Sequence, residues 1–312
     1  MEEWRSINFR KEHRNGEKMK RESKKRNQKV SLKSIFIIAR MEYVRALFDA
    51  RNLVVCSMFL VFYEMILREL LQMSQNMDKP IQILEPFLAV CSSDAVMIML
   101  PIVFFILISD FPKNEENFFY FISRCGKGNW LIGQFIHSIW VVLTYVGVLV
   151  VVTICMAAPL SFAENNWSTV ATQYYILFPE EKKTMVNELI NGTLYNQTFP
   201  YQAFLHSFLL YSLYFMLLSV ISLLFYVFQK RIYGLLVNGV LIVAGGISAF
   251  CDLKIKWFLP SAHAIVWKHY DSVLKGSECT ITGSYIYYLL LIGIGILLIS
   301  IQVKKWNVIK SG

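Results

Sequence analysis

Glu115 and Glu116 are adjacent carboxylates, and paired glutamates can act as general acid and general base in an intramembrane hydrolase. In the known intramembrane hydrolases with such a pair, the motif also has an arginine four residues after the second glutamate. Tyr120 stands at that position, and the pair falls in a charged connector between two apolar runs. The pattern therefore does not favour hydrolysis at this point of the chain.

Nucleotide and metal chemistry find no better support in the motifs. The nearest approach to the phosphate-binding pattern GxxxxGK[ST], at residues 126–128, lacks both the earlier glycine and the hydroxyl residue, so we expect no ATP hydrolysis and no cofactor in this chain. The patterns HExxH and GxSxG are also missing. The cysteines form no CxxC pair, which argues against a metal site, and they are scattered along the chain: Cys56, Cys91, Cys125, Cys155, Cys251 and Cys279.

Two polar side chains inside apolar runs are the remaining candidates for chemistry. We expect Asp94 about two turns from the outer end of its span and His137 about two turns from the inner end of the next one. Polar groups are costly in lipid unless they face a partner or a cavity. Each is therefore a candidate for an interhelical hydrogen bond, a vestibule contact or a pathway residue, and their different depths argue against one shared catalytic site.

The composition predicts the elements that must position these residues. Hydrophobic residues make up 55% of the chain and charged residues 17%, which is typical of an integral membrane protein. A transmembrane helix needs about 20 mostly apolar residues. The predicted fold class is an all-α integral membrane protein with six transmembrane helices, at roughly 53–71, 87–109, 131–157, 203–228, 232–251 and 284–303.

The distribution of charge predicts the orientation. Residues 1–51 hold 15 of the 31 Lys and Arg, and segments 110–130, 229–231 and 304–312 raise that side to 23, against 8 on the other. By the positive-inside rule we expect both termini in the cytosol of a multi-pass cell-membrane protein. The basic stretch over 1–30 lacks interleaved aromatic residues, so we interpret it as a disordered tail near anionic lipid, with no nucleic acid as partner.

Three segments between the spans also carry structural signals. Residues 32–47 repeat apolar side chains at three- and four-residue steps, which predicts an amphipathic helix in the membrane interface, with packing on protein as the alternative. Residues 158–202 form a polar outer loop that can either fold into a small cap or be disordered. Residues 252–283, with several aromatics and Pro260, favour short interfacial or re-entrant helices.

The connector over 110–130 is unusually apolar for a short link between spans. Asn114 can cap a helix that carries Glu115 and Glu116 in its first turn and Arg124 at its end, as the helix dipole favours. Such a helix would offer an apolar face to a groove in a cytosolic partner; the alternative is that these side chains lie in the headgroup region or pack against the ends of the spans. The side chains of that face are Phe118, Phe119, Phe121 and Ile122.

This order of parts resembles the membrane subunits of ABC transporters, specifically the type 2 exporter permeases. The resemblance covers residues 31–312: an amphipathic elbow helix (FIIARMEYVRALFDARN), six spans, a connector ending in SRCGKGNWLIGQFI, and a late outer segment before the last span. In that family the connector ends in a basic run with a tryptophan and a Gly-Lys pair. Gln134 replaces the usual lysine here, and the other positions are matched by Arg124, Lys127, Trp130 and Gly133.

The resemblance implies a mechanism and a set of partners. Residues 114–124 would form a coupling helix seated in a separate ATP-binding subunit, which would hold the ATP and magnesium. A second permease subunit, identical or not, would complete a pathway near the second and fifth spans for a peptide, antibiotic or lipid-like substrate. Two other functions stay open: a non-transporting membrane sensor or immunity protein with residues 158–202 as ligand cap, and an intramembrane hydrolase.

Overall fold

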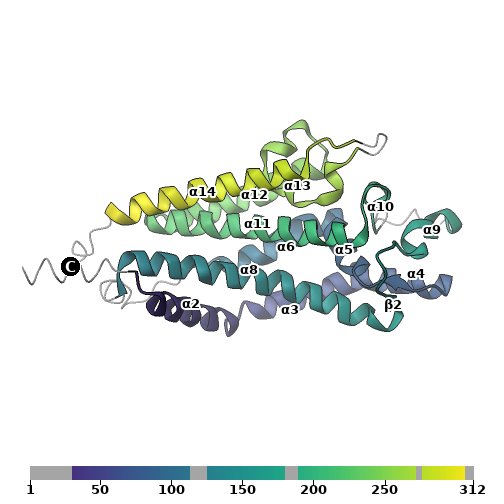
Figure 1. The fold of residues 1–312 in the computed structure, drawn as a ribbon, viewed down its shortest axis with the longest axis horizontal. Coiled ribbons are helices and arrows are strands. Elements are labelled where there is room, and N and C mark those ends of the chain that lie inside the picture. Colours follow the sequence, from purple (N-terminus) through teal and green to yellow (C-terminus); the bar gives the residue numbers. More distant parts are fainter. Residues whose placement is uncertain (1–29, 113–124, 180–188, 272–275, 306–312) are drawn as a thin grey trace, which may run out of the picture.

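The computed structural model describes residues 30–112, 125–179, 189–271 and 276–305 (Figure 1). The described chain consists of helices laid along one long axis, with a two-stranded sheet at one end. We call the end that holds residues 112 and 125 the connector end, and the opposite end the far end. The predicted coupling helix lies outside the described residues, and with it Glu115, Glu116, Phe118, Phe119, Phe121, Ile122 and Arg124.

Four described helices are long and apolar enough to cross a membrane, and each coincides with a predicted span. α11 is the central helix and packs on the other three. Continuous apolar runs produce helices without a polar face, which is stable only inside a protein core or in lipid. This is compatible with an all-α membrane protein. The bounds are α8 Lys127–Ala157, α11 Pro200–Val227, α12 Arg231–Phe250 and α14 Ile281–Lys305.

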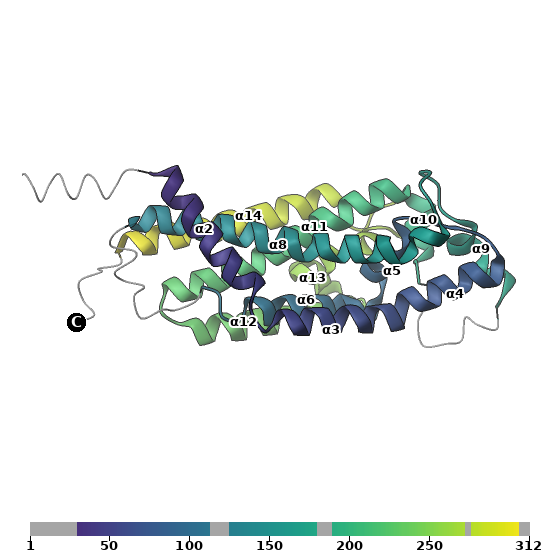
Figure 2. The same cartoon turned by 90° about the horizontal axis from the view of Figure 1, so that it is seen from below.

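The first predicted span falls within an unbroken helical run that lies beside α6 (Figure 2). The expected pair of Glu64 and Arg68 is present, with Arg68 Nη1 donating to Glu64 Oε2 at 2.6 Å. By length and hydropathy the described residues contain four spans, or five with the bent pair described next, so the count of six stays a prediction. The run consists of α3 Asn52–Phe62, a π turn Tyr63–Leu67 and α4 Arg68–Met77.

The second predicted span is not one straight helix, which corrects the expectation over 87–109. It bends by 89° at Ser93, whose backbone is extended. Serine and aspartate favour such breaks because their side chains compete for backbone hydrogen bonds. Two freed carbonyls find distant donors: Tyr211 Oη donates to Cys91 O at 3.2 Å, and Trp267 Nε1 to Ser92 O at 3.1 Å. The two halves are α5 Glu85–Ser92 and α6 Asp94–Ile108.

The predicted amphipathic helix is present as α2, Leu32–Leu47, and it crosses α8 (Figure 2). Ile38 is buried against α8, and the contact needs glycine at 133 because a Cβ there would lie 2.7 Å from Ile38 Cγ2. One face of α2 therefore packs on protein. A second apolar face is exposed and available for lipid, with Leu32, Phe36, Ile37, Leu47 and Phe48.

The far end carries a small folded cap formed from the predicted outer loop. Glu85 is fully buried beneath it and accepts hydrogen bonds from Ser168 N and Ser168 Oγ, both at 2.7 Å. The strands pair in parallel, with Ile81 opposite Ser161. The described part of the loop therefore folds as a cap. The loop contributes the 3-10 turn η2 Ala158–Leu160, β2 Ser161–Phe162, α9 Thr169–Leu177 and α10 Gly192–Gln197, and the segment before α5 contributes β1 Ile81–Gln82.

The late outer segment folds into the short helices that the sequence predicts, packed between α11, α12 and α14. The close approach of α13 to α12 depends on Gly245 of α12, because a Cβ added there would lie 2.3 Å from Ser261 Oγ of α13. Cys251 and Cys279, which border this segment, are free thiols. The short helices are η4 Lys254–Phe258, α13 Pro260–Ala264 and η5 Val266–His269.

Candidate functional site

Asp110 lies just past the end of α6, immediately before the undescribed part of the connector. The helix ends here because Pro112 cannot continue it, and Phe111 N closes a tight turn onto Ile108 O at 2.9 Å. Ser109 Oγ donates to Ile106 O at 2.8 Å and so satisfies a carbonyl of the last turn. The chain thereby presents the Asp110 carboxylate at the base of the connector.

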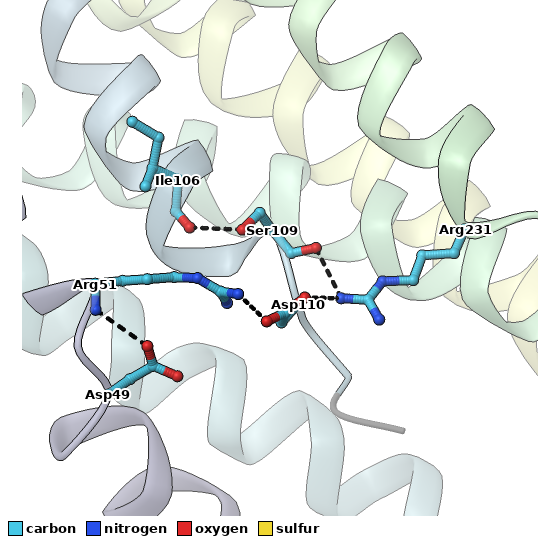
Figure 3. Close-up of polar contacts among 6 residues, drawn as sticks. All are labelled: Asp49, Arg51, Ile106, Ser109, Asp110 and Arg231. Carbon is cyan, nitrogen blue, oxygen red and sulfur yellow. Dashed lines mark hydrogen bonds and ion pairs between the residues drawn. The ribbon is translucent and has the colours of Figure 1, made fainter. Parts of the chain in front are cut away.

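Two arginines from distant parts of the chain bind this carboxylate (Figure 3). Arg51 donates to Asp110 Oδ2 and Arg231 to Asp110 Oδ1. Arg231 also donates to Ser109 O at 3.0 Å. The side chains of Arg51, Asp110 and Arg231 are 27%, 44% and 34% exposed, so water screens the two ion pairs only in part. We call these three residues the Asp110 clamp.

The clamp joins three elements that the sequence separates. Arg51 comes from the turn between α2 and α3, where Arg51 N donates to Asp49 Oδ1 at 3.0 Å. Asn52 stabilises the same turn, since its Nδ2 donates to Ala46 O at 2.7 Å at the end of α2. Arg231 is the first residue of α12. One carboxylate therefore links the turn between α2 and α3, the end of α6 and the start of α12 at the point where the connector leaves the bundle.

A small cavity lies beside the clamp, and it contains the predicted polar residue His137. Its volume is about 40 Å³, which suits one or a few water molecules and excludes an organic substrate. The ring of Phe111 stacks on that of His137 with centroids 5.2 Å apart. His137 Nδ1 has no hydrogen-bond partner among the described residues, and a water here would supply one. The lining includes Glu42, Asp49, Arg51, Asp110 and His137.

Asp94 and His137, the two polar candidates, do not meet. Asp94 is the first residue of α6, whereas His137 contacts Phe111 beyond its other end. The 15 residues of α6 place them about 22 Å apart along the axis. Asp94 instead lies near Lys268, where burial lowers the pKa of the ammonium group and attraction by the Asp94 carboxylate partly offsets that change.

Two residues of the family-like connector run contribute to packing at this end. Trp130 is buried, with its ring 6.2 Å from that of Tyr226, and Gly133 allows the close contact of α2 with α8. Asn129 Oδ1 accepts from Ser31 N at 3.1 Å, which anchors the start of α2. The run thus holds α2 against the first turns of α8.

Comparison with protein-family models, curated proteins and solved structures gives no match for this chain. The family resemblance therefore rests on the order of parts along the sequence. Within the described ranges, no group of three His, Cys, Asp or Glu side chains could hold a metal ion. The Asp110 clamp is the candidate site because it links the most elements next to the connector.

Sequence reasoning did not find the clamp. Residues 229–231 were considered there only as basic charge, and residues 110–130 as basic charge and as the predicted coupling helix, with no role for Asp110. The available signal was an acidic residue directly after an apolar run, which needs a cation if it is to stay at a helix end. Nothing in the spacing indicated that its partners are Arg51 and Arg231.

Neutralising Asp110 tests the clamp. We expect Asp110→Asn to lower the free energy of unfolding by about 1–2 kcal/mol, between the values for exposed and buried ion pairs, because both arginines lose their anion. Thermal unfolding in lipid nanodiscs measures this. Lys230→Gln is the matched control: Lys230 neighbours Arg231 but is exposed, and the change should stay within about 0.5 kcal/mol. Equal stability of the two variants would contradict the role of the clamp.

Proposed function

We propose that this chain is the membrane-spanning subunit of an ATP-driven ABC transporter that exports a peptide, antibiotic or lipid-like substrate. A separate ATP-binding subunit supplies the energy, and a second permease subunit completes the pathway. The order of parts over residues 31–312 supports the class. The observation that carries the proposal is the Asp110 clamp at the base of the connector.

A coupling segment can move membrane helices only if the residues that join it to them are held rigidly against those helices. A flexible junction would move without moving the helices, whereas charge-assisted hydrogen bonds from two directions hold the junction in place. Asp110 stands three residues before position 113 and is tied to α12 and to the turn between α2 and α3. A push on residues 113–124 would therefore reach α6, α12 and the elbow helix together.

The decisive experiment is purification of the tagged chain from its own cells in mild detergent, with mass spectrometry of the proteins that co-purify. We expect a stoichiometric partner that carries a Walker A loop and the ABC signature. The same experiment identifies the second permease subunit as this chain or another. Recovery of the folded chain alone would count against the transporter and favour a sensor.

The predicted coupling face gives a sharper test within that complex. Replacing Phe118 and Phe121 with serine removes two large apolar side chains, which should weaken docking by about 3 kcal/mol or more, about 100-fold in affinity. The matched control is Glu116→Lys, which should cost less than about 1 kcal/mol because an exposed charge contributes little. Undiminished co-purification of the ATP-binding subunit with the double variant would refute docking through this face.

A non-transporting sensor or immunity protein is the second candidate, and the folded cap favours it. Buried Glu85 of α5 binds the cap through Ser168, and within the cap Trp167 Nε1 donates to Thr198 O at 2.6 Å. An ordered cap is a suitable surface for a ligand outside the membrane. A transport assay in reconstituted vesicles distinguishes the two candidate functions, because only a transporter moves substrate across the membrane in an ATP-dependent way.

A further inference from the structure

Two histidines converge on one serine hydroxyl in the late outer segment. His263 of α13 places its Nδ1 2.7 Å from Ser284 Oγ of α14, and His269 of η5 places its Nε2 at the same distance from the same oxygen. All three side chains are buried. The cluster thus joins both short helices to the first turn of α14. We call it the His–Ser–His cluster.

The outer nitrogen of each imidazole contacts a backbone carbonyl. His263 Nε2 lies 2.8 Å from Trp257 O, and His269 Nδ1 lies 2.9 Å from Ile265 O. A carbonyl oxygen can only accept, so both of these ring nitrogens must carry a hydrogen. In a neutral imidazole the inner nitrogen is then an acceptor.

A count of hydrogens shows what the cluster lacks. The four contacts need four hydrogens, one for each. Two neutral imidazoles supply two, and the Ser284 hydroxyl supplies one. With both histidines neutral, one of the inner nitrogens therefore faces Ser284 Oγ without a hydrogen between them. One added proton on either imidazole completes the set.

We propose that the His–Ser–His cluster is a binding site for a single proton, which the two histidines share through Ser284. Protonation of one imidazole turns the remaining nitrogen-to-oxygen contact into a charge-assisted hydrogen bond. A second proton is disfavoured because it would place a positive charge on each side of Ser284 Oγ, which could then donate to neither imidazole. The inference stands apart from the transporter proposal.

The surroundings set the pH at which the proton binds. Burial lowers the pKa of His269 to about 4 and also lowers that of His263. The ring of Tyr287 stacks on His263 at 4.1 Å, and its electron-rich face favours a cation. The ring of Trp257, from η4, also contacts His263, with the two ring centroids 5.3 Å apart. Proton uptake is therefore expected in the acidic range, below neutral pH.

Other titratable groups near the cluster come from α11, from α14 and from the segment itself. From α11 these are His206, whose charge would oppose a proton on His269, and Tyr214, which shares a 3.0 Å hydrogen bond with Ser261. Tyr288 of α14 donates to Pro260 O at 2.6 Å. The neighbouring charges of the segment itself are Lys256, Lys268, Asp252 and Glu278. Lys256 is paired with both carboxylates, Asp252 at 2.6 Å and Glu278 at 2.8 Å.

The sign of the effect on stability follows from the lowered pKa. The folded chain binds this proton more weakly than an unfolded histidine with a pKa of about 6.5. The neutral pair therefore contributes stability at high pH, and that contribution is lost as the pH falls from about 6.5 toward the folded value. The hydrogen bond that the proton completes offsets part of this loss.

Nitrogen-15 NMR of histidine-labelled full-length chain in phosphatidylcholine vesicles, from pH 8 to pH 4, tests the proposal. His263→Gln and His269→Gln assign the two rings among the 5 histidines of the chain. We expect one imidazole of the pair to become doubly protonated while the other stays neutral. Two independent titrations over the same pH range, or no uptake before the chain unfolds, would overturn the shared site.

Ser284→Ala removes the shared acceptor and should move proton uptake to lower pH by about one unit or more. His206→Gln is the matched control: His206 bonds Tyr285 at 3.0 Å and does not touch Ser284, so one proton should still be shared. An unchanged titration in Ser284→Ala would contradict the proposal. If that variant does not fold, the titration of the unmodified chain decides by itself.

Discussion

Replacing Glu85 with alanine is expected to detach the cap at the far end, lowering its local free energy of unfolding by about 2–4 kcal/mol. The carboxylate accepts from Ser168 N, Ser168 Oγ and Gln82 N, and it is fully buried. Ser168 in turn caps α9, since its Oγ accepts from Ala171 N at 3.0 Å. Removing Glu85 therefore leaves buried donors unpaired and loosens the first turn of α9.

Hydrogen–deuterium exchange of the purified chain in nanodiscs measures this change. The amides of residues 168–172 should exchange about 30- to 1,000-fold faster, while those of α11 keep their protection. Glu164→Ala is the matched control, because Glu164 is an exposed carboxylate of the same loop. Unaltered exchange over residues 168–172 in Glu85→Ala would show that the cap is held by other contacts.

A methyl group at Gly245 is expected to cost about 1–3 kcal/mol of stability, although alanine is the better helix former. The new Cβ would lie 2.3 Å from Ser261 Oγ and 3.0 Å from Ser261 Cβ. Ser261 cannot move away freely, since its hydroxyl shares a hydrogen bond with Tyr214 Oη at 3.0 Å. Relief of the clash would have to displace α13 from α12.

Gly239→Ala is the matched control on the same helix, because nothing lies within 4 Å of a Cβ built there. Helix propensity alone predicts a gain of up to about 1 kcal/mol for this variant. The two variants should therefore shift the thermal unfolding midpoint in nanodiscs in opposite directions. A stabilised Gly245→Ala would mean that α13 does not pack against α12 at this position.

The four long helices were predictable because their signal is local. α8, α11, α12 and α14 each come from a continuous apolar run of sufficient length, and such a run has no other stable state in an apolar solvent. The amphipathic α2 and the short helices of the late outer segment also followed from periodicity and from Pro260. The sequence did not predict which face of α2 packs on α8, because that contact depends on Gly133 in another helix.

The bend at Ser93 was not predictable, since hydropathy reflects composition and carries no information on which side chains can hydrogen-bond to the backbone at a break. The break persists because Tyr211 and Trp267 donate to the carbonyls that it frees, and both are remote in sequence. The same holds for the clamp, where Asp110 is an ordinary connector charge until Arg51 and Arg231 reach it. The predicted coupling helix lies outside the described residues, so its prediction stands as the sequence made it.

The amino-acid sequence was enough to predict a lipid environment and the long helices, because apolar runs of about 20 residues leave a chain few alternatives to spanning a membrane. Which polar groups of separate elements meet depends on the tertiary structure. Asp110 with its two arginines, Glu85 under the cap and the His–Ser–His cluster each join residues from separate elements. Such pairs form because a buried polar group must find a partner, and the fold alone determines which one lies within reach.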